Sequence, residues 1–232
     1  MRAALVETAD SALHWRELGP DDIEAVEALH RLAVGPVVRP DIVKPESRSY
    51  FESILAGRGR VIGGFDQTQA DAEHCLVAYG ILQHEHAPKD NWEMDLNVAP
   101  GTATGRLAGA SVAPAFRGRG LQRATIAARV AMAPRAMLLF STAAPINTPS
   151  WASLLAEGFP IHGLVRRYGG YARYLMVRDH SLHDSEQAIS VDPTDIAAQL
   201  ALFEKGWHGF ARTRLPSGLP GILFAPPIGR HP

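Results

Sequence analysis

The residues best suited to chemistry in this sequence form a short run of glycine and arginine, Arg117-Gly118-Arg119-Gly120-Leu121-Gln122. Apolar residues from Ile126 to Ala131 recur at helical spacing directly after it, so the run is predicted to open a helix. The first turn of a helix leaves backbone N–H groups unpaired and carries a partial positive charge. Glycine lets that backbone approach a ligand closely. The run therefore predicts a pocket for a phosphate or pyrophosphate, with full positive charges nearby on Arg117, Arg119 and Arg123.

A strand ending in Val112-Ala113-Pro114 precedes this turn, and the combination resembles the acetyl-CoA-binding motif of the GNAT family of N-acetyltransferases. The family pattern is Arg/Gln-x-x-Gly-x-Gly/Ala after Val-x-Pro, and Gln122 stands at its last small position. A second family signature follows in Asn147-Thr148-Pro149-Ser150 and Gly158-Phe159. The match covers residues 13–178 and extends most closely to bacterial members with an Arg-Gly-Leu-Gln turn and a later Tyr168-Gly169-Gly170-Tyr171-Ala172-Arg173.

The resemblance implies that acetyl-CoA is a cosubstrate. Backbone amides of the glycine turn would cradle its pyrophosphate, and main-chain groups of Val112 and its neighbours would pair with the pantetheine arm. A backbone N–H near Val112 would polarise the thioester carbonyl as a small oxyanion hole. Asn147 and Ser150 would contact the arm, although their segment also fits a plain helix cap. The predicted cofactor-binding residues are Val112, Ala113, Arg117, Gly118, Arg119, Gly120, Leu121, Gln122, Asn147 and Ser150.

The usual acid–base pair of the family is absent from this sequence. Leu154 stands where many members have the tyrosine that protonates the departing thiolate, and residues 107–111 lack the usual glutamate. Two carboxylates of a long loop are candidates for deprotonating an ammonium substrate through water, and a tyrosine is the candidate proton donor. The catalytic residues predicted in this way are Glu93, Asp95 and Tyr168, with Tyr171 and Ser111 as further options.

These motifs favour an acetyl-CoA-dependent N-acetyltransferase. A bound primary amine would attack the thioester directly in a ternary complex, because no activated nucleophile is visible. The acceptor is a small-molecule or peptide amine whose identity depends on freely varying loops. The missing tyrosine and glutamate keep an alternative open, a non-catalytic module of the same fold that binds or senses an acyl-CoA. A nucleotide phosphate loop is disfavoured, since the turn lacks both Gly-Lys-Ser/Thr and Gly-x-Gly-x-x-Gly.

The composition, 46% hydrophobic and 20% charged residues, is typical of a soluble globular protein. The net charge of −1 argues against a nucleic-acid partner, and no apolar window approaches the ~20 residues that span a bilayer. The single cysteine, Cys75, cannot form an intramolecular disulfide and favours a cytoplasmic location. The histidines of His84-Glu85-His86 and His180-x-x-His183 lack an evident third ligand, so no metal is predicted.

The elements that must position these residues are those of an α/β (α+β) GNAT fold. Residues 1–180 are predicted to form the acetyltransferase domain, with a mixed central sheet of about six to seven strands flanked by helices. Residues 84–106 are predicted to be a long functional or mobile connection. Residues 181–232 are predicted to add one helix and a proline-rich tail, an extended strap or disordered, packed on that domain. This appendage could also contact a second subunit of a homodimer.

Overall fold

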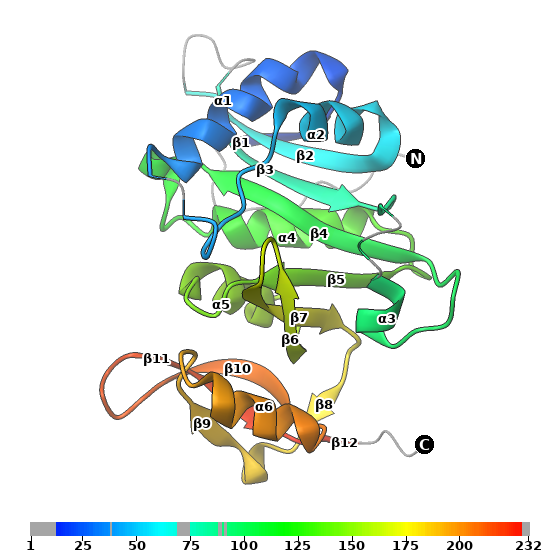
Figure 1. The fold of residues 1–232 in the computed structure, drawn as a ribbon. Helices are drawn as coiled ribbons and strands as arrows, with labels where there is room; N and C mark the ends of the chain where they lie inside the picture. Colours follow the sequence, from blue (N-terminus) through cyan, green and yellow to red (C-terminus); the bar gives the residue numbers. More distant parts are fainter. Residues whose placement is uncertain (1–12, 38, 69–74, 88–89, 91, 229–232) are drawn as a thin grey trace.

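The computed structural model describes residues 13–37, 39–68, 75–87, 90 and 92–228. A mixed sheet of ten strands runs through them in the order β1-β2-β3-β4-β5-β7-β6-β10-β11-β9 (Figure 1). Only β4 and β5 pair in parallel; the other neighbours in this sheet are antiparallel. The strands are β1 (Leu13–Leu18), β2 (Gly59–Asp66), β3 (Leu76–Gln83), β4 (Thr104–Val112), β5 (Leu138–Ala143), β6 (Ile161–Arg167), β7 (Tyr171–Arg178), β9 (Ile189–Val191), β10 (His208–Arg214) and β11 (Pro220–Ala225).

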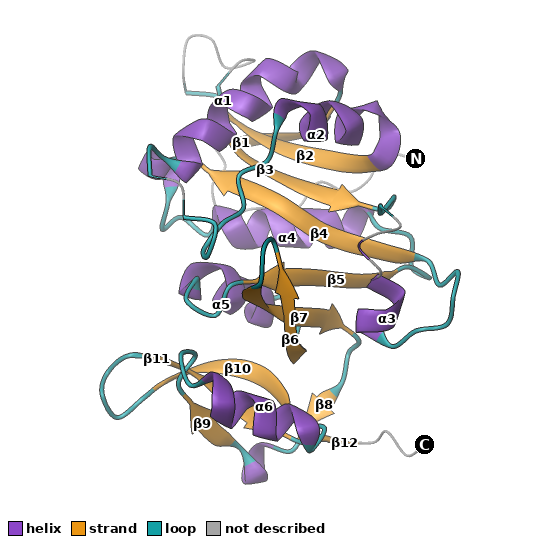
Figure 2. Ribbon diagram, viewed as in Figure 1, coloured by secondary structure: helices purple, strands orange, loops and turns teal. Residues whose placement is uncertain are grey.

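Helices cover both faces of this sheet (Figure 2). On β3, Tyr79 meets the ring of Phe51 from α2, whereas Gly80 lies against Arg129 of α4. Successive strand residues point to opposite faces, so α2 and α4 pack on opposite sides of β3. The helices are α1 (Ile23–Val34), α2 (Arg48–Ser53), α3 (Trp92–Leu96), α4 (Leu121–Met132), α5 (Thr148–Ala156) and α6 (Ile196–Glu204).

The centre of the sheet is opened by two irregularities in β4. Its pairing with β5 runs from Thr104 opposite Leu138 to Leu107 opposite Ser141, while its pairing with β3 continues to Val112. The edge of β4 that faces β5 is therefore unpaired over residues 108–112. A β-bulge also shifts the register with β3 between Gly80 and Leu82, which bends the strand where the two parallel strands separate.

The sheet is larger than the six to seven strands predicted, because the C-terminal residues continue it. The predicted added helix is confirmed as α6, but residues 208–225 form β10 and β11, and β9 pairs with β11. Gly209 opposite Ile161 joins β10 to β6. These strands were not predicted because the segment is rich in proline and its clearest periodicity is helical. Pro220 and Pro227 stand at the first positions of β11 and β12, where a missing N–H is tolerated.

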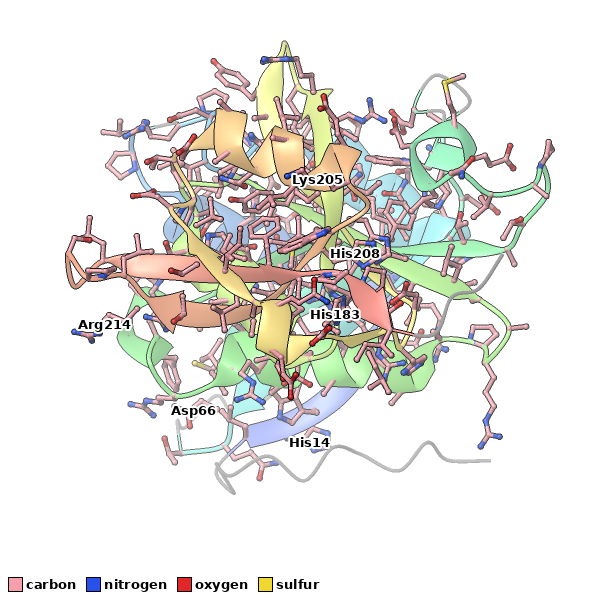
Figure 3. The ribbon with its side chains drawn as sticks, turned by 90° about the horizontal axis from the view of Figure 1, so that it is seen from below. His14, Asp66, His183, Lys205, His208 and Arg214 are labelled. Carbon is pink, nitrogen blue, oxygen red and sulfur yellow. The ribbon has the colours of Figure 1, made fainter. Side chains whose placement is uncertain are left out.

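A small second sheet pairs β12 (Pro227–Ile228) with β8 (Leu182–His183). Seen from below, His183 and His208 lie beside each other there (Figure 3), with His183 Nε2 and His208 Nδ1 3.3 Å apart. The proline-rich segment up to Ile228 is thus extended and paired, as the first of the two predicted alternatives required. In the described part of the chain, no helix combines the length and apolarity needed to cross a membrane.

Candidate functional site

The glycine turn has the geometry that its sequence predicts. Gly118 and Gly120 have φ values of +81° and +79°, a left-handed conformation that favours glycine. A Cβ atom added at either position would have no other heavy atom within 4 Å. Gly120 is the N-cap of α4, and no side chain caps the helix there. The first backbone amides of α4 therefore stand at an open surface that suits an anionic ligand.

A cavity of about 200 Å³ begins beside this turn and follows the unpaired edge of β4. At one end it is lined by Gln122 of α4 and by Asn147 and Ser150 at the start of α5. Asn147 Oδ1 also accepts a hydrogen bond from the Ser150 backbone N–H at 3.4 Å. Asn147 therefore both caps α5 and lines the cavity, so the two interpretations of this segment are compatible.

The predicted catalytic residues are divided between the cavity and a different region. Tyr168 lines the cavity. Glu93 and Asp95 lie on α3 and are not among the lining residues. The Glu93 carboxylate accepts a hydrogen bond from the Gly101 backbone N–H at 2.8 Å, and Asp95 forms an ion pair with Arg167. Both carboxylates thus have structural partners outside the cavity.

A buried chain of polar side chains reaches the cavity from α1. His30 Nδ1 lies 3.0 Å from the Tyr79 hydroxyl, which lies 3.2 Å from Ser111 Oγ. His30 Nε2 accepts the Glu46 backbone N–H at 3.0 Å, so a neutral imidazole carries its proton on Nδ1 and donates it to Tyr79. Burial lowers the pKa of His30, against the opposing charge of Glu27, and favours this neutral form.

The Tyr79 oxygen accepts hydrogen bonds from both of its neighbours in this chain. His30 donates to it from Nδ1, and the Ser111 hydroxyl donates to it at 3.2 Å. Burial raises the pKa of Tyr79, so the phenol stays protonated at neutral pH. Ser111 and His30 line the cavity, whereas Tyr79 is completely buried. The three side chains therefore form one hydrogen-bonded chain that joins α1 to β4 beside the cavity.

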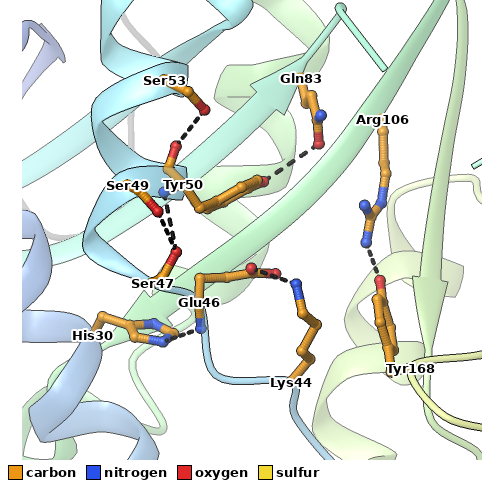
Figure 4. A network of polar contacts seen from close by, with 10 residues as sticks. All are labelled: His30, Lys44, Glu46, Ser47, Ser49, Tyr50, Ser53, Gln83, Arg106 and Tyr168. Atoms are coloured by element: carbon orange, nitrogen blue, oxygen red, sulfur yellow. Dashed lines mark hydrogen bonds and ion pairs between the residues drawn. The ribbon is translucent and has the colours of Figure 1, made fainter. Parts of the chain in front are cut away.

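The other end of the cavity is formed by the segment before α2 and the turn between β6 and β7 (Figure 4). Lys44 Nζ forms an ion pair with Glu46 at 2.7 Å, and Arg106 donates a hydrogen bond to the Tyr168 hydroxyl. Arg173 donates to the backbone carbonyls of Pro40 at 2.6 Å and Asp41 at 3.1 Å. The Arg173 hydrogen bonds thus tie the segment before α2 to β7, next to the turn that carries Tyr168.

Arg129 of α4 lines the cavity from below and is only 2% exposed. Its guanidinium donates to Thr125 at 2.9 Å and, more loosely, to the backbone carbonyls of Ile81 at 3.4 Å and Ala108 at 3.5 Å, the two residues beside the bulge. Burial lowers the pKa of Arg129 to about 9. A Cβ on Gly80 would come within 2.7 Å of its Nε.

Sequence reasoning missed most of the polar side chains around this cavity. One signal was available: Arg129 lies four and eight residues after Thr125 and Leu121, on the apolar face of a helix, where an arginine is unusual. For the side chains from distant segments no local signal exists. The residues missed are His30, Lys44, Glu46, Tyr79, Arg106, Arg129 and Arg173.

Metal binding finds no support in the described residues. No group of three or more histidine, cysteine, aspartate or glutamate side chains there is arranged to hold an ion. His86 instead packs near the Phe140 ring, with centroids 5.8 Å apart, and His183 lies with His208 at the small second sheet. One histidine of each sequence pattern, His86 and His183, thus takes part in a contact with another ring.

Solved structures place this architecture in a known fold. The chain is similar to NAA60 of Arabidopsis thaliana in complex with a bisubstrate analogue, at 18% identity and a TM-score of 0.53 over 72% of this chain and 98% of that one. It is similar to a GNAT phosphinothricin acetyltransferase of Sinorhizobium meliloti in complex with acetyl-CoA, at 16% identity and a TM-score of 0.52. That match covers 72% of this chain and 88% of the other. The ribosomal-protein-S18-alanine N-acetyltransferase of Escherichia coli is similar at 18% identity and a TM-score of 0.51. That match covers 75% of this chain and 97% of the other.

These matches show that the chain has the GNAT acetyltransferase fold. They cover nearly all of the Arabidopsis thaliana and Escherichia coli chains but only about three quarters of this one, so this chain is longer than the shared fold. Neither a protein-family profile nor a curated protein matches the sequence.

Proposed function

We propose that this protein is an acetyl-CoA-dependent N-acetyltransferase that transfers the acetyl group to a primary amine by direct attack in a ternary complex. The observation that carries the proposal is the continuity of one cavity. It runs from the uncapped start of α4 along the unpaired edge of β4 to a polar chamber at the far end. A diphosphate would lie at the helix start, and an extended arm would pair with the free strand edge.

The cofactor residues of this proposal are those that the sequence predicted. Backbone amides between Arg117 and Gln122 would bind the pyrophosphate, and Asn147 and Ser150 would contact the arm. Backbone groups of β4 near Val112 would polarise the thioester carbonyl, where developing negative charge is best stabilised by preorganised donors. Arg117 already donates to the Ala33 carbonyl at 2.9 Å, which anchors the turn to the end of α1.

The proton chemistry is assigned to side chains that the cavity brings together. Among the described residues that line it, Glu46 carries the one carboxylate and would accept a proton from the acceptor ammonium. The amine nitrogen then forms a bond to the thioester carbon, and the carbon–sulfur bond breaks. The Ser111 hydroxyl, which donates to Tyr79 at 3.2 Å, would turn to give its proton to the thiolate, and Ser111 would regain a proton through Tyr79 and His30. The ammonium nitrogen loses two protons in the whole reaction, and the sulfur gains one. One proton is therefore released overall.

The relay is tested by Ser111→Ala and Tyr79→Phe. Each should lower kcat by about 10²-fold, the usual contribution of a positioned general acid, while the acetyl-CoA Kd stays the same. Ser153→Ala on α5 is the matched control, because the Ser153 hydroxyl donates to the Pro149 carbonyl at 2.7 Å and the residue does not line the cavity. Unchanged kcat in both relay variants would remove Ser111 from the mechanism.

The overall proposal is tested by incubating the protein with acetyl-CoA and a panel of amines and measuring release of free coenzyme A. Calorimetry measures acetyl-CoA binding in parallel. Binding with turnover supports the transferase. Tight binding without turnover across the panel favours the acyl-CoA-sensing module instead. Failure to bind acetyl-CoA contradicts both functions.

A further inference from the structure

We propose that the acceptor amine also carries an anionic oxyacid group, a carboxylate or a phosphate, which binds to Lys44 and Arg106 beside Tyr168. This inference rests on the proposed acetyl transfer and adds the class of acceptor. It is carried by the charges at the end of the cavity away from the glycine turn. The acceptor would lie with its ammonium toward Glu46 and its anionic group toward the two cations.

The lining of the cavity has a marked excess of positive charge. Four cationic side chains, Lys44, Arg106, Arg129 and Arg173, face a single carboxylate, that of Glu46, which is already paired with Lys44. In the part of the chain that the structure describes, the three arginines contact neutral oxygens and rings but form no ion pair with a carboxylate. Charges held away from water without a partner are costly, and a bound anion would offset that cost.

Arg106 has unused capacity for a ligand. Its terminal nitrogen donates to the Tyr168 hydroxyl, its guanidinium lies over the Trp92 ring at 5.1 Å, and its Nε is buried without a hydrogen-bond partner. A guanidinium presents five N–H donors in a planar fork that matches an oxyacid group. The buried, unpaired Nε is a donor that an anionic oxygen in the cavity could satisfy.

Three of the cationic side chains lie around the phenol of Tyr168. Lys44 Nζ lies 5.5 Å from the centre of its ring and the Arg173 guanidinium carbon 5.3 Å, while Arg106 donates to its oxygen. Since that oxygen accepts from Arg106, the Tyr168 O–H is available to donate to an anion. The residue has φ of +55°, an uncommon conformation for a tyrosine that the following glycines and the surrounding contacts hold in place.

These cations are placed too far from the glycine turn to serve the diphosphate. Arg106 precedes Val112 by six residues along β4, which corresponds to about 20 Å at the usual rise of a strand. It also stands before the point where β4 and β5 separate, after Leu107. The Tyr168 cluster therefore lies beyond the reacting centre, on the side that the acceptor must occupy if the cofactor enters from α4.

The test compares amines in matched pairs that differ only in the anionic group. Amino acids are paired with their carboxamides, and amino-alcohol phosphates with the parent amino alcohols, so the two arms separate carboxylate from phosphate. We measure kcat/KM at saturating acetyl-CoA, and Kd by calorimetry with and without coenzyme A. The anionic member of at least one pair should be preferred by about tenfold or more, and the preference should shrink as salt is raised.

Variants locate the preference within the cavity. Arg106→Gln and Lys44→Gln should each reduce it about tenfold and leave the acetyl-CoA Kd unchanged, and Arg106→Lys should restore part of it. Arg212→Gln removes the same charge from an exposed position on β10 and should change nothing. If Arg106→Gln fails to fold, Lys44→Gln carries the test, because the Lys44 side chain is 44% exposed.

The outcomes separate this inference from the function on which it rests. Acetylation of neutral amines with no anionic preference in turnover or binding would overturn the anionic acceptor and leave the transferase standing. Selective binding of anionic amines by a protein that does not bind acetyl-CoA would overturn the transferase and leave the anionic binding site standing. A preference that persists in both the Arg106→Gln and the Lys44→Gln variants would also overturn the inference, because the anion would then bind elsewhere.

Discussion

At the scale of single residues, the backbone conformation of Gly120 supports the most specific prediction about cofactor binding. Gly120→Glu should abolish binding of acetyl-CoA, because it strains a φ of +79° and puts a carboxylate at the N-terminus where the diphosphate would lie. Gly218→Glu, at a φ of +85° in the turn between β10 and β11, imposes a similar strain elsewhere and should bind normally. Calorimetric titration measures both; near-normal affinity of Gly120→Glu would exclude the turn as the binding site.

His30 gives a residue-scale prediction about pH. Its pKa in the folded protein is lowered by burial, so below about pH 6.5 the unfolded chain takes up a proton that the folded chain refuses. The stability present above that pH is therefore lost as the pH falls, with a slope of at most about 1.4 kcal/mol per pH unit. Urea unfolding between pH 7.5 and 5.5 should show a shallower pH dependence in His30→Gln than in the natural protein. Equal slopes would contradict a neutral, buried His30.

At the scale of elements, α4 and the bulge in β3 and β4 are expected to be energetically coupled. Gly80→Ala would place a Cβ 2.7 Å from Arg129 Nε, and Arg129 is held by hydrogen bonds to Thr125. The substitution should lower the free energy of unfolding by about 1–3 kcal/mol. In an Arg129→Met background the cost should be smaller by about 1 kcal/mol or more, as for residues in direct contact.

A control for this double-mutant comparison of Gly80→Ala and Arg129→Met lies on the neighbouring strand, β4. A Cβ added at Gly109 meets only Ile81 Cδ1, at 3.7 Å, an ordinary van der Waals distance, so Gly109→Ala should cost much less than Gly80→Ala. Denaturant unfolding monitored by tryptophan fluorescence gives all of these values. Additive effects of Gly80→Ala and Arg129→Met would show that Arg129 does not depend on the glycine.

At the scale of the whole molecule, the C-terminal strands share a hydrophobic core with the acetyltransferase fold. Ile222 and Phe224 of β11 and Leu202 of α6 belong to the same buried cluster as Trp151 and Phe159. Phe224→Ala should therefore lower the free energy of unfolding by about 3–5 kcal/mol in a single cooperative transition. Ile228→Ala, at a position 55% exposed, is the control and should cost little. Two separate transitions would mean that residues 181–232 fold as an independent unit.

The sequence by itself determined the local structure of the proposed cofactor site. A glycine turn, a helix start and an apolar strand are local features, and short-range sterics and hydrogen bonding fix them wherever the chain folds. Leu121 opens α4 directly after the glycine turn, as predicted. Up to Arg178 the large sheet has seven strands, β1 to β7, in agreement with the six to seven predicted.

Only the tertiary structure decided which polar side chains line the cavity and how large the sheet is. His30, Glu46, Arg106 and Tyr168 come from four distant segments, and no local pattern specifies which of them share a cavity. Glu93 and Asp95 were predicted from their place in a long loop, yet that loop contains α3, which packs Trp92 on Phe140, and neither carboxylate lines the cavity. The C-terminal strands form because β10 can pair with the edge of β6 and because apolar side chains of β11 can pack on those of α5. Such long-range pairing depends on the assembled fold.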